Sequence, residues 1–188
     1  MRINVATHNA HKLAEIAAIW PDAELNAEDT GAEETAGTFA GNALIKARAL
    51  AALHPGEWTM ADDSGLEVEA LGGAPGVRSA RYAGEPTNTP ANNALLLANL
   101  AGCENRRARF TCAIALVAPD GAEHVVEGHC QGVISETPSG SNGFGYDPLF
   151  VPDGHSLSFA ELPPEEKNRI SHRSRALAEA AKILPQQP

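Results

Sequence analysis

Two different spacings of apolar residues alternate along the first part of the chain. The run over residues 2–7 predicts a strand, and the helical spacing that follows it predicts a helix ended by Pro21. A second helix is predicted over residues 39–53, with Thr38 as its N-terminal cap. The apolar run that starts at Trp58 predicts a buried strand.

The second half of the chain continues this alternation. Its predicted elements are a half-exposed strand over 66–71, a helix over 90–101, strands over 106–118 and 123–134, a helical turn over 163–167 and a helix over 171–184 capped by Ser171. Residues 119–121 (Pro-Asp-Gly) predict a hairpin between the two long strands. Residues 113–117 are apolar throughout, so we expect core on both faces of that hairpin.

Composition favours an ordinary globular domain with a sizeable core. The chain has 188 residues, of which 43% are apolar and 20% charged. It lacks an apolar run of about 18 residues, and its first residues are too polar for a signal peptide. Three cysteines without a CxxC spacing argue against a disulfide framework or zinc site, and we expect the cytoplasm as compartment. The net charge of −10 disfavours nucleic acid and membranes as partners.

Asp62 and Asp63 are the first candidates for chemistry. Asp is a poor strand residue, so we expect the pair where the strand from Trp58 leaves the sheet, which is where ligands bind in open α/β sheets. One carboxylate would face the ligand while its neighbour braces the loop. Carboxylate oxygens suit Mg²⁺, and a carboxylate beside the metal can activate water. A simple Asp-Asp-Ser-Gly turn is the alternative.

The segment 7–12 (Thr-His-Asn-Ala-His-Lys) joins the first strand to the first helix. A helix N-terminus with a lysine attracts phosphates, although Thr7 or Asn9 could equally be an ordinary cap. The acidic run 28–37 is either solvated surface or the source of a metal ligand. Lys46 and Arg48, on the second helix, are interpreted as surface charges.

Two further segments have unusual polar residues. Residues 138–150 form a glycine-rich loop with Phe144 and Tyr146, and exposed aromatics on such a loop often bind flat ligands, although packing would also explain Phe144. His172 and Arg173 lie in the first turn of the last predicted helix, where the helix dipole disfavours cations. Such a placement indicates function more than stability.

Taken in order, these segments resemble the inosine triphosphate pyrophosphatase family, the Ham1-like non-canonical purine nucleoside triphosphatases. The resemblance covers nearly the whole chain. It rests on THNAHK (7–12), EET (33–35), TFAGNALIKAR (38–48), ADDSGL (61–66), LGGAPGVRSARYAG (71–84), GFGYDPLF (143–150) and AELPPEEKNRISHR (160–173). Seven motifs in the same order make the match specific.

The resemblance implies a single α/β domain over residues 1–188, with a mixed curved sheet, flanking helices and two lobes around a central cleft. It implies a homodimer that uses Mg²⁺ to hydrolyse inosine, deoxyinosine and xanthosine triphosphates to the monophosphate and pyrophosphate. Asp63 would be the catalytic carboxylate, and Glu33 and Asp63 would hold the metal. The substrate would be bound by Thr7, His8, Asn9, Ala10, His11, Lys12, Ser64, Phe144, Gly145, Tyr146, Asp147, Lys167, His172 and Arg173.

Base selection is expected to depend on hydrogen-bond donors. Hypoxanthine and xanthine offer the acceptors O6 and N7, which Arg173 could meet, whereas adenine presents an amino group there. Two positions depart from many relatives, which have Gly where this chain has His11 and Glu where it has Gly41. A nucleotide-binding module without turnover, or a Maf-type pyrophosphatase acting on modified pyrimidine nucleotides, is therefore the alternative.

Overall fold

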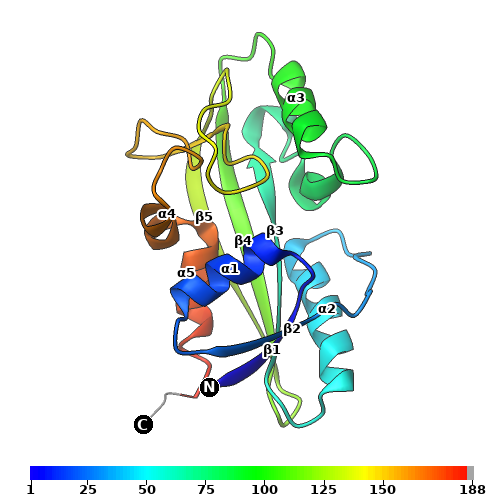
Figure 1. Cartoon of the computed structure of the whole chain (residues 1–188). Coiled ribbons are helices and arrows are strands. Elements are labelled where there is room, and N and C mark those ends of the chain that lie inside the picture. Colours follow the sequence, from blue (N-terminus) through cyan, green and yellow to red (C-terminus); the bar gives the residue numbers. More distant parts are fainter. Residues whose placement is uncertain (186–188) are drawn as a thin grey trace. The chain divides into compact units, whose positions relative to one another are not determined.

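The computed structural model describes residues 1–185, and it contains a six-stranded sheet in the order β2–β1–β3–β4–β5–β6 (Figure 1). The strands are β1 (Arg2–Ala6), β2 (Glu24–Glu28), β3 (Thr59–Val68), β4 (Arg107–Val117), β5 (Glu123–Ile134) and β6 (Phe150–Pro152). The helices are α1 (Ala10–Ile19), α2 (Phe39–Leu53), α3 (Thr89–Asn99), α4 (Pro164–Ile170) and α5 (His172–Ala180). β1 is parallel to β2 and β3, whereas β5 is antiparallel to β6, so the expected mixed sheet is confirmed.

The chain divides into two compact units, whose boundaries fall inside the long strands. Unit 1 comprises residues 1–63, 112–128 and the segment from His172 onward, and unit 2 comprises 64–111 and 129–171. β3, β4 and β5 therefore contribute residues to both units. Each unit buries its own apolar core.

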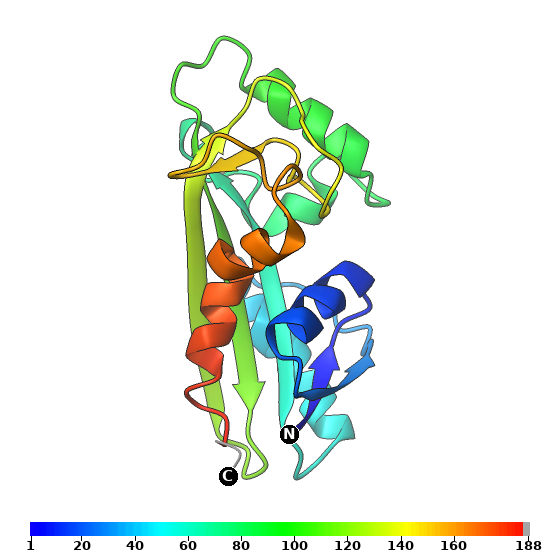
Figure 2. The same ribbon diagram turned by 60° about the vertical axis from the view of Figure 1, so that its left-hand side comes forward.

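The core of unit 1 packs α1 and α5 against β1, β3 and β4. It includes Ile3, Val5, Ile16, Met60, Cys112, Ile114, Leu116, Ala176, Leu177 and Ala180. α5 runs along β5 (Figure 2) and approaches it closely at Gly128, where a Cβ atom would lie 2.3 Å from the backbone N of Ala176 and the backbone O of His172. Glycine at this position therefore lets the start of α5 lie directly against the strand.

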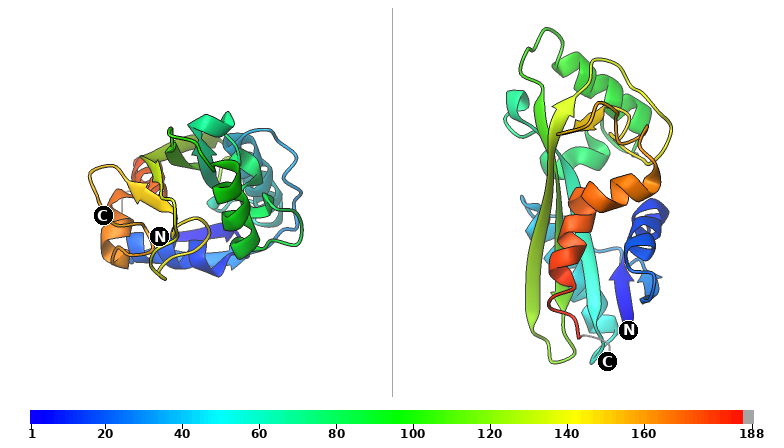
Figure 3. Two further views of the ribbon diagram at one scale, coloured as in Figure 1. Left: turned by 90° about the horizontal axis from the view of Figure 1, so that it is seen from above. Right: turned by 90° about the vertical axis from the view of Figure 1, so that its left-hand side faces the viewer.

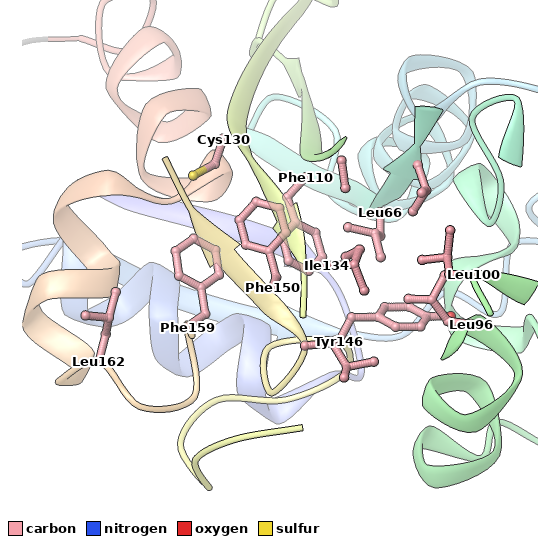
Figure 4. Close-up of a cluster of buried hydrophobic side chains, with 13 residues drawn as sticks. Leu66, Leu96, Leu100, Phe110, Cys130, Ile134, Tyr146, Phe150, Phe159 and Leu162 are labelled. Carbon is pink, nitrogen blue, oxygen red and sulfur yellow. The ribbon is translucent and has the colours of Figure 1, made fainter. Parts of the chain in front are cut away.

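The core of unit 2 is built around three phenylalanines, from β4, β6 and the segment after β6 (Figure 4). The ring centroids of Phe110 and Phe150 are 4.7 Å apart, and those of Phe150 and Phe159 are 5.0 Å apart. Such pairs add about 0.5–1.5 kcal/mol each beyond the burial of their area. Leu96 and Leu100, from α3 and its end, complete this core.

β4 and β5 form the predicted hairpin, joined by a tight turn (Figure 3). The N–H of Ala118 donates to the carbonyl of Ala122, and the N–H of Gly121 donates to the carbonyl of Ala118, both at 2.8 Å. Residues 113–117 are all buried, so the prediction of core on both faces is confirmed. Within residues 1–185, no helix is long and apolar enough to cross a membrane.

Some predictions about elements were wrong, and two strands were missed. β3 does not end at the aspartates but continues through Asp62 and Asp63 to Val68, so the predicted strand over 66–71 does not exist separately. β2 and β6 were not predicted; the five residues of β2 (Glu-Leu-Asn-Ala-Glu) alternate between polar and apolar, but none of them is buried. The last helix ends at Ala180 instead of Leu184.

Candidate functional site

The interior of β3 carries the two neighbouring carboxylates. Successive strand residues point to opposite faces, so Asp62 and Asp63 meet different helices. The Oδ2 of Asp62 lies 3.1 Å from Nζ of Lys12, on α1, and accepts a hydrogen bond from Nη2 of Arg173, on α5, at 3.1 Å. The Oδ2 of Asp63 instead accepts from Nδ2 of Asn42, on α2, at 3.0 Å. The expectation that the two side chains have different roles is consistent with this placement.

Asp62 is completely buried and ionised. Burial raises its pKa, but the positive charges of Lys12 and Arg173 outweigh this, so the pKa lies well below the ordinary value for Asp. Arg173 is itself buried, and its Nη1 donates to the carboxylate of Glu15. Asp62 thus balances two cations on the α1 and α5 side of the sheet.

Asp63 has the opposite electrostatic character. Burial raises its pKa most, the positive charge of Lys46 lowers it by less, and the negative charge of Glu34 raises it again, against a smaller lowering by Lys12. The pKa of Asp63 therefore lies above the ordinary value. A carboxylate whose pKa is shifted toward neutrality is a better general base than an ordinary one.

Lys46 belongs to this site, so its interpretation as a surface charge was wrong. Its Nζ donates to Glu34 at 2.7 Å and to the backbone carbonyl of Asp62 at 2.8 Å, and it lies 3.9 Å from Oδ1 of Asp63. Burial lowers its pKa, but the surrounding carboxylates outweigh this and the pKa is raised. Arg48, also on α2, is a surface charge as predicted. Helical spacing alone did not separate these two cations.

The start of α1 is capped by its own chain. The side-chain oxygen of Asn9 accepts from the N–H groups of His11 and Lys12 at 3.0 and 3.1 Å, and the Thr7 hydroxyl accepts from the N–H of Asn9. The capping interpretation is therefore confirmed. The charge that this segment offers to a phosphate is the side chain of Lys12.

Four of the expected site residues, His8, Ala10, His11 and Glu33, lie at the surface. His8 is exposed and pairs with Asp29 at 3.2 Å. Glu33 is exposed in the acidic loop, whereas its neighbour Glu34 turns inward to Lys46. The structure thus brings Glu34, and not Glu33, into the electrostatic surroundings of Asp63.

The carboxylates around Asp63 would bind Mg²⁺ only if a substrate supplied further ligands to the same ion. Within residues 1–185, no three His, Cys, Asp or Glu side chains are grouped to hold a metal ion. Mg²⁺ is usually bound by one or two carboxylates together with substrate phosphates and water. Asp63, with a carboxylate of the acidic loop, meets that requirement.

Unit 2 holds a second group of expected residues. The Oδ2 of Asp147 accepts from the backbone N–H of Phe144 at 2.9 Å and from Nζ of Lys167 at 2.6 Å. The same Nζ lies 5.1 Å from the centroid of the Phe144 ring. A Cβ at Gly143 would lie 2.0 Å from Asp147, so glycine permits this contact. The ammonium group is thereby held over the aromatic ring.

Other expected residues of unit 2 have packing roles or lie in strands. Tyr146 is buried, its hydroxyl donates to the carbonyl of Ser79 at 2.7 Å, and burial raises its pKa above the ordinary value. The interpretation of Tyr146 as an exposed aromatic was therefore wrong. The carbonyl of Gly145 accepts from Asn93 at 3.1 Å, and Ser64 is half-buried in β3.

His172 and Arg173 begin α5, as predicted, and both are buried. Nη1 and Nη2 of Arg173 donate to Glu15 and Asp62, and its expected role as reader of the base edge stays a prediction. These carboxylates also explain why a cation is tolerated in the first turn of a helix. Neither partner could be identified from sequence spacing, since they come from α1 and β3.

The two departures from many relatives cause no strain in the backbone. His11 is the second residue of α1, and residues 1–185 contain no non-glycine residue with positive φ. A Cβ at Gly41 would lie 2.6 Å from the Cβ of Ala36 and 3.0 Å from Oγ1 of Thr38. A larger residue at 41 would therefore have to displace the loop that precedes α2.

The fold and these residues define an α/β protein with buried carboxylates and lysines suited to phosphate chemistry. The chain belongs to the Ham1 family, whose sequence profile matches residues 3–183. It is 48% identical to a dITP/XTP pyrophosphatase of Streptomyces avermitilis, over 97% of this chain and 96% of that protein. The Ham1 protein of Staphylococcus aureus has a similar structure, with a TM-score of 0.86, 39% identity and 97% of each chain covered. A nucleoside-triphosphatase / dITP/XTP pyrophosphatase of Mycobacterium abscessus gives a TM-score of 0.76 and 48% identity, covering 99% of this chain and 100% of that one.

Proposed function

We propose that this protein hydrolyses non-canonical purine nucleoside triphosphates, namely those of inosine, deoxyinosine and xanthosine, to the monophosphate and pyrophosphate. Family membership and the names of the relatives support this activity. The observation that carries it is the environment of Asp63, a buried carboxylate with a raised pKa beside Lys46. Cleavage of a phosphoanhydride needs such a base together with positive charge.

The residues of unit 1 are assigned to the phosphates. Lys12 and Lys46 neutralise charge on the polyphosphate, and Asp63 accepts the proton of the attacking water. Mg²⁺, when bound, would polarise the phosphate oxygens and assist ionisation of the water. Asp63 and an acidic-loop carboxylate would hold it, with Glu33 as the family-derived candidate and Glu34 as the one that the geometry favours.

The residues of unit 2 are assigned to the base. Phe144 offers an aromatic ring for a purine to stack on, and the Lys167 ammonium group, which lies over that ring at 5.1 Å from its centroid, offers hydrogen-bond donors close to it. An ammonium group donates but cannot accept, so it favours the 6-oxo group of hypoxanthine and xanthine over the 6-amino group of adenine. Lys167 is thus a second candidate for the discriminating role, beside Arg173, which the family resemblance implies.

We further propose, from the family resemblance, that the protein is a cytoplasmic homodimer that binds neither nucleic acid nor membranes. The net charge of −10 supports the last two points. The remaining residues of segments 7–12 and 143–147, with Ser64 and His172, would border the bound nucleotide.

A panel of nucleoside triphosphates tests the function. Purine and modified pyrimidine triphosphates are incubated with protein and Mg²⁺, and pyrophosphate and orthophosphate are measured separately. We expect pyrophosphate as first product, fastest from the inosine and xanthosine nucleotides. Orthophosphate as first product would refute the reaction, a preference for modified pyrimidines would favour a Maf-type enzyme, and binding without turnover would favour a binding module.

A further inference from the structure

Asp62 differs from Asp63 in being surrounded by cations on several sides. Its Oδ2 lies 3.1 Å from Nζ of Lys12 and accepts a hydrogen bond from Nη2 of Arg173 at 3.1 Å. Its backbone carbonyl accepts a hydrogen bond from Nζ of Lys46 at 2.8 Å. These cations come from α1, α5 and α2, the helices of unit 1 that flank β3. Asp62 is 1% exposed, so its carboxylate is itself shielded from solvent.

Lys12 and Arg173 converge on the same carboxylate oxygen. Two cations that share one buried anion repel each other, and only the charge of that anion holds them together. Removing the anion would leave the more accessible cation, Lys12, free to swing outward, whereas Arg173 keeps Glu15 as a partner. The position of Lys12 therefore depends on Asp62 more than that of Arg173 does.

We propose that Asp62 is a positioning residue, whose carboxylate holds the Lys12 ammonium group where it can bind the polyphosphate. This inference deepens the proposed function and rests on it for the role of Lys12. It assigns to the two adjacent aspartates separate tasks, since Asp63 serves the attacking water while Asp62 acts only through a lysine.

Asp62→Asn is a suitable probe because it keeps the shape of the side chain. Its amide oxygen can still accept from both cations at the position of Oδ2, while the amide nitrogen takes the place of Oδ1, which has no hydrogen-bond partner among residues 1–185. The variant thus removes charge with little change in volume. Asp62→Glu is the second variant, because it keeps the charge but moves the carboxylate by one methylene.

The test is a double-mutant cycle read by binding of inorganic tripolyphosphate. Affinity is measured by calorimetry without divalent cations, for wild type, Asp62→Asn, Lys12→Ala and the double variant, after circular dichroism and melting show that each is folded. We expect Lys12→Ala to weaken binding by about tenfold. We expect Asp62→Asn to weaken it by about fivefold in wild type and to have almost no effect once Lys12 is absent.

The outcomes separate positioning from other roles. If Asp62→Asn weakens binding by the same factor in both backgrounds, its role is structural and the proposal is wrong. If it tightens binding, Asp62 only neutralises Lys12, which also overturns the proposal. If Asp62→Asn does not fold, the cycle is run with Asp62→Glu, for which we expect weaker binding that again depends on Lys12, and an equal loss in both backgrounds contradicts the proposal.

A second cycle uses kcat/KM for inosine triphosphate and pairs Asp62→Asn with Phe144→Leu. Because Phe144 is assigned to the base, we expect the two losses to multiply, and coupling as large as that with Lys12 would contradict specific action through the lysine.

Failure of the proposed function is recognised separately from failure of this proposal. Absence of pyrophosphate release by wild type refutes the activity, while the tripolyphosphate cycle still decides the role of Asp62.

Discussion

The carboxylate of Asp147 holds Lys167 at 2.6 Å and leaves its ammonium group 5.1 Å from the centre of the Phe144 ring. The same carboxylate oxygen fixes the loop through the N–H of Phe144. One buried acid thus sets both an aromatic face and a hydrogen-bond donor. In the proposed function, a base bound at Phe144 would meet that donor.

Base selectivity should therefore depend on Lys167. We expect Lys167→Met to lower kcat/KM for inosine triphosphate by about 10-fold or more while changing that for adenosine triphosphate little, because only the 6-oxo group accepts from an ammonium. Lys182→Met, at an exposed lysine paired with Glu179, is the control. Arg173→Lys should lower both values alike. A ratio that changes with Arg173 and not with Lys167 would return the base-reading role to Arg173.

Turnover should depend on the carboxylate of Asp63. Asp63→Asn keeps the size and the contact with Asn42 but removes the base, so we expect kcat to fall by about 10²–10⁴-fold with an unchanged circular dichroism spectrum. Asp153→Asn, at an exposed pair with Arg107, serves as the matched control. Near wild-type kcat for Asp63→Asn would show that another group activates the water.

The two cations of α2 provide a direct comparison. Lys46→Ala should raise KM or lower kcat/KM for all triphosphates by a similar factor, since the lysine responds to phosphate charge and not to the base. Arg48→Ala, on the same helix, should leave kcat/KM unchanged, because it pairs with Glu123 at the surface. Equal effects of Lys46→Ala and Arg48→Ala on kcat/KM would mean that Lys46 affects activity only through the stability of the fold.

A divalent cation should be required for turnover. Dialysis against chelator should abolish pyrophosphate release, and Mg²⁺ should restore it, because Asp63 and the acidic loop provide too few ligands to retain a metal without substrate phosphates. The chelated protein should still bind tripolyphosphate through Lys12. Full turnover in excess chelator would contradict the role assigned to the metal.

The outer face of unit 2 offers a test of acid stability. Burial raises the pKa of Glu67, but hydrogen bonds from Arg109 and Thr111 outweigh this and lower it. A lowered pKa stabilises the folded state at pH values above the ordinary pKa of Glu. That contribution is lost as the pH falls through the folded-state pKa. Glu67→Gln should thus destabilise at pH 7 by up to about 1 kcal/mol and destabilise less at pH 3, as measured by urea unfolding. An equal effect at both pH values would rule out ionisation as the cause.

Local patterns in the sequence were sufficient for much of the fold. The helix Phe39–Leu53, its Thr38 cap and the strand Glu123–Ile134 were predicted with their observed boundaries, because apolar spacing and capping residues act over a few neighbouring positions. The ordered motifs also indicated the family, which the profile match confirms.

Only the tertiary structure decided the partners of the charged residues. Asp62 remains inside β3 because Lys12 and Arg173 compensate its burial, while Asp63 has Asn42 and, at 3.9 Å, Lys46 beside it, and these partners come from three helices outside β3 in the sequence. Strand propensity predicted that the strand would end at the aspartates, because it contains no information on charges that are distant in the sequence. For the same reason, Lys46 and Arg48 were indistinguishable in sequence, although Lys46 is half-buried among carboxylates and Arg48 lies at the surface.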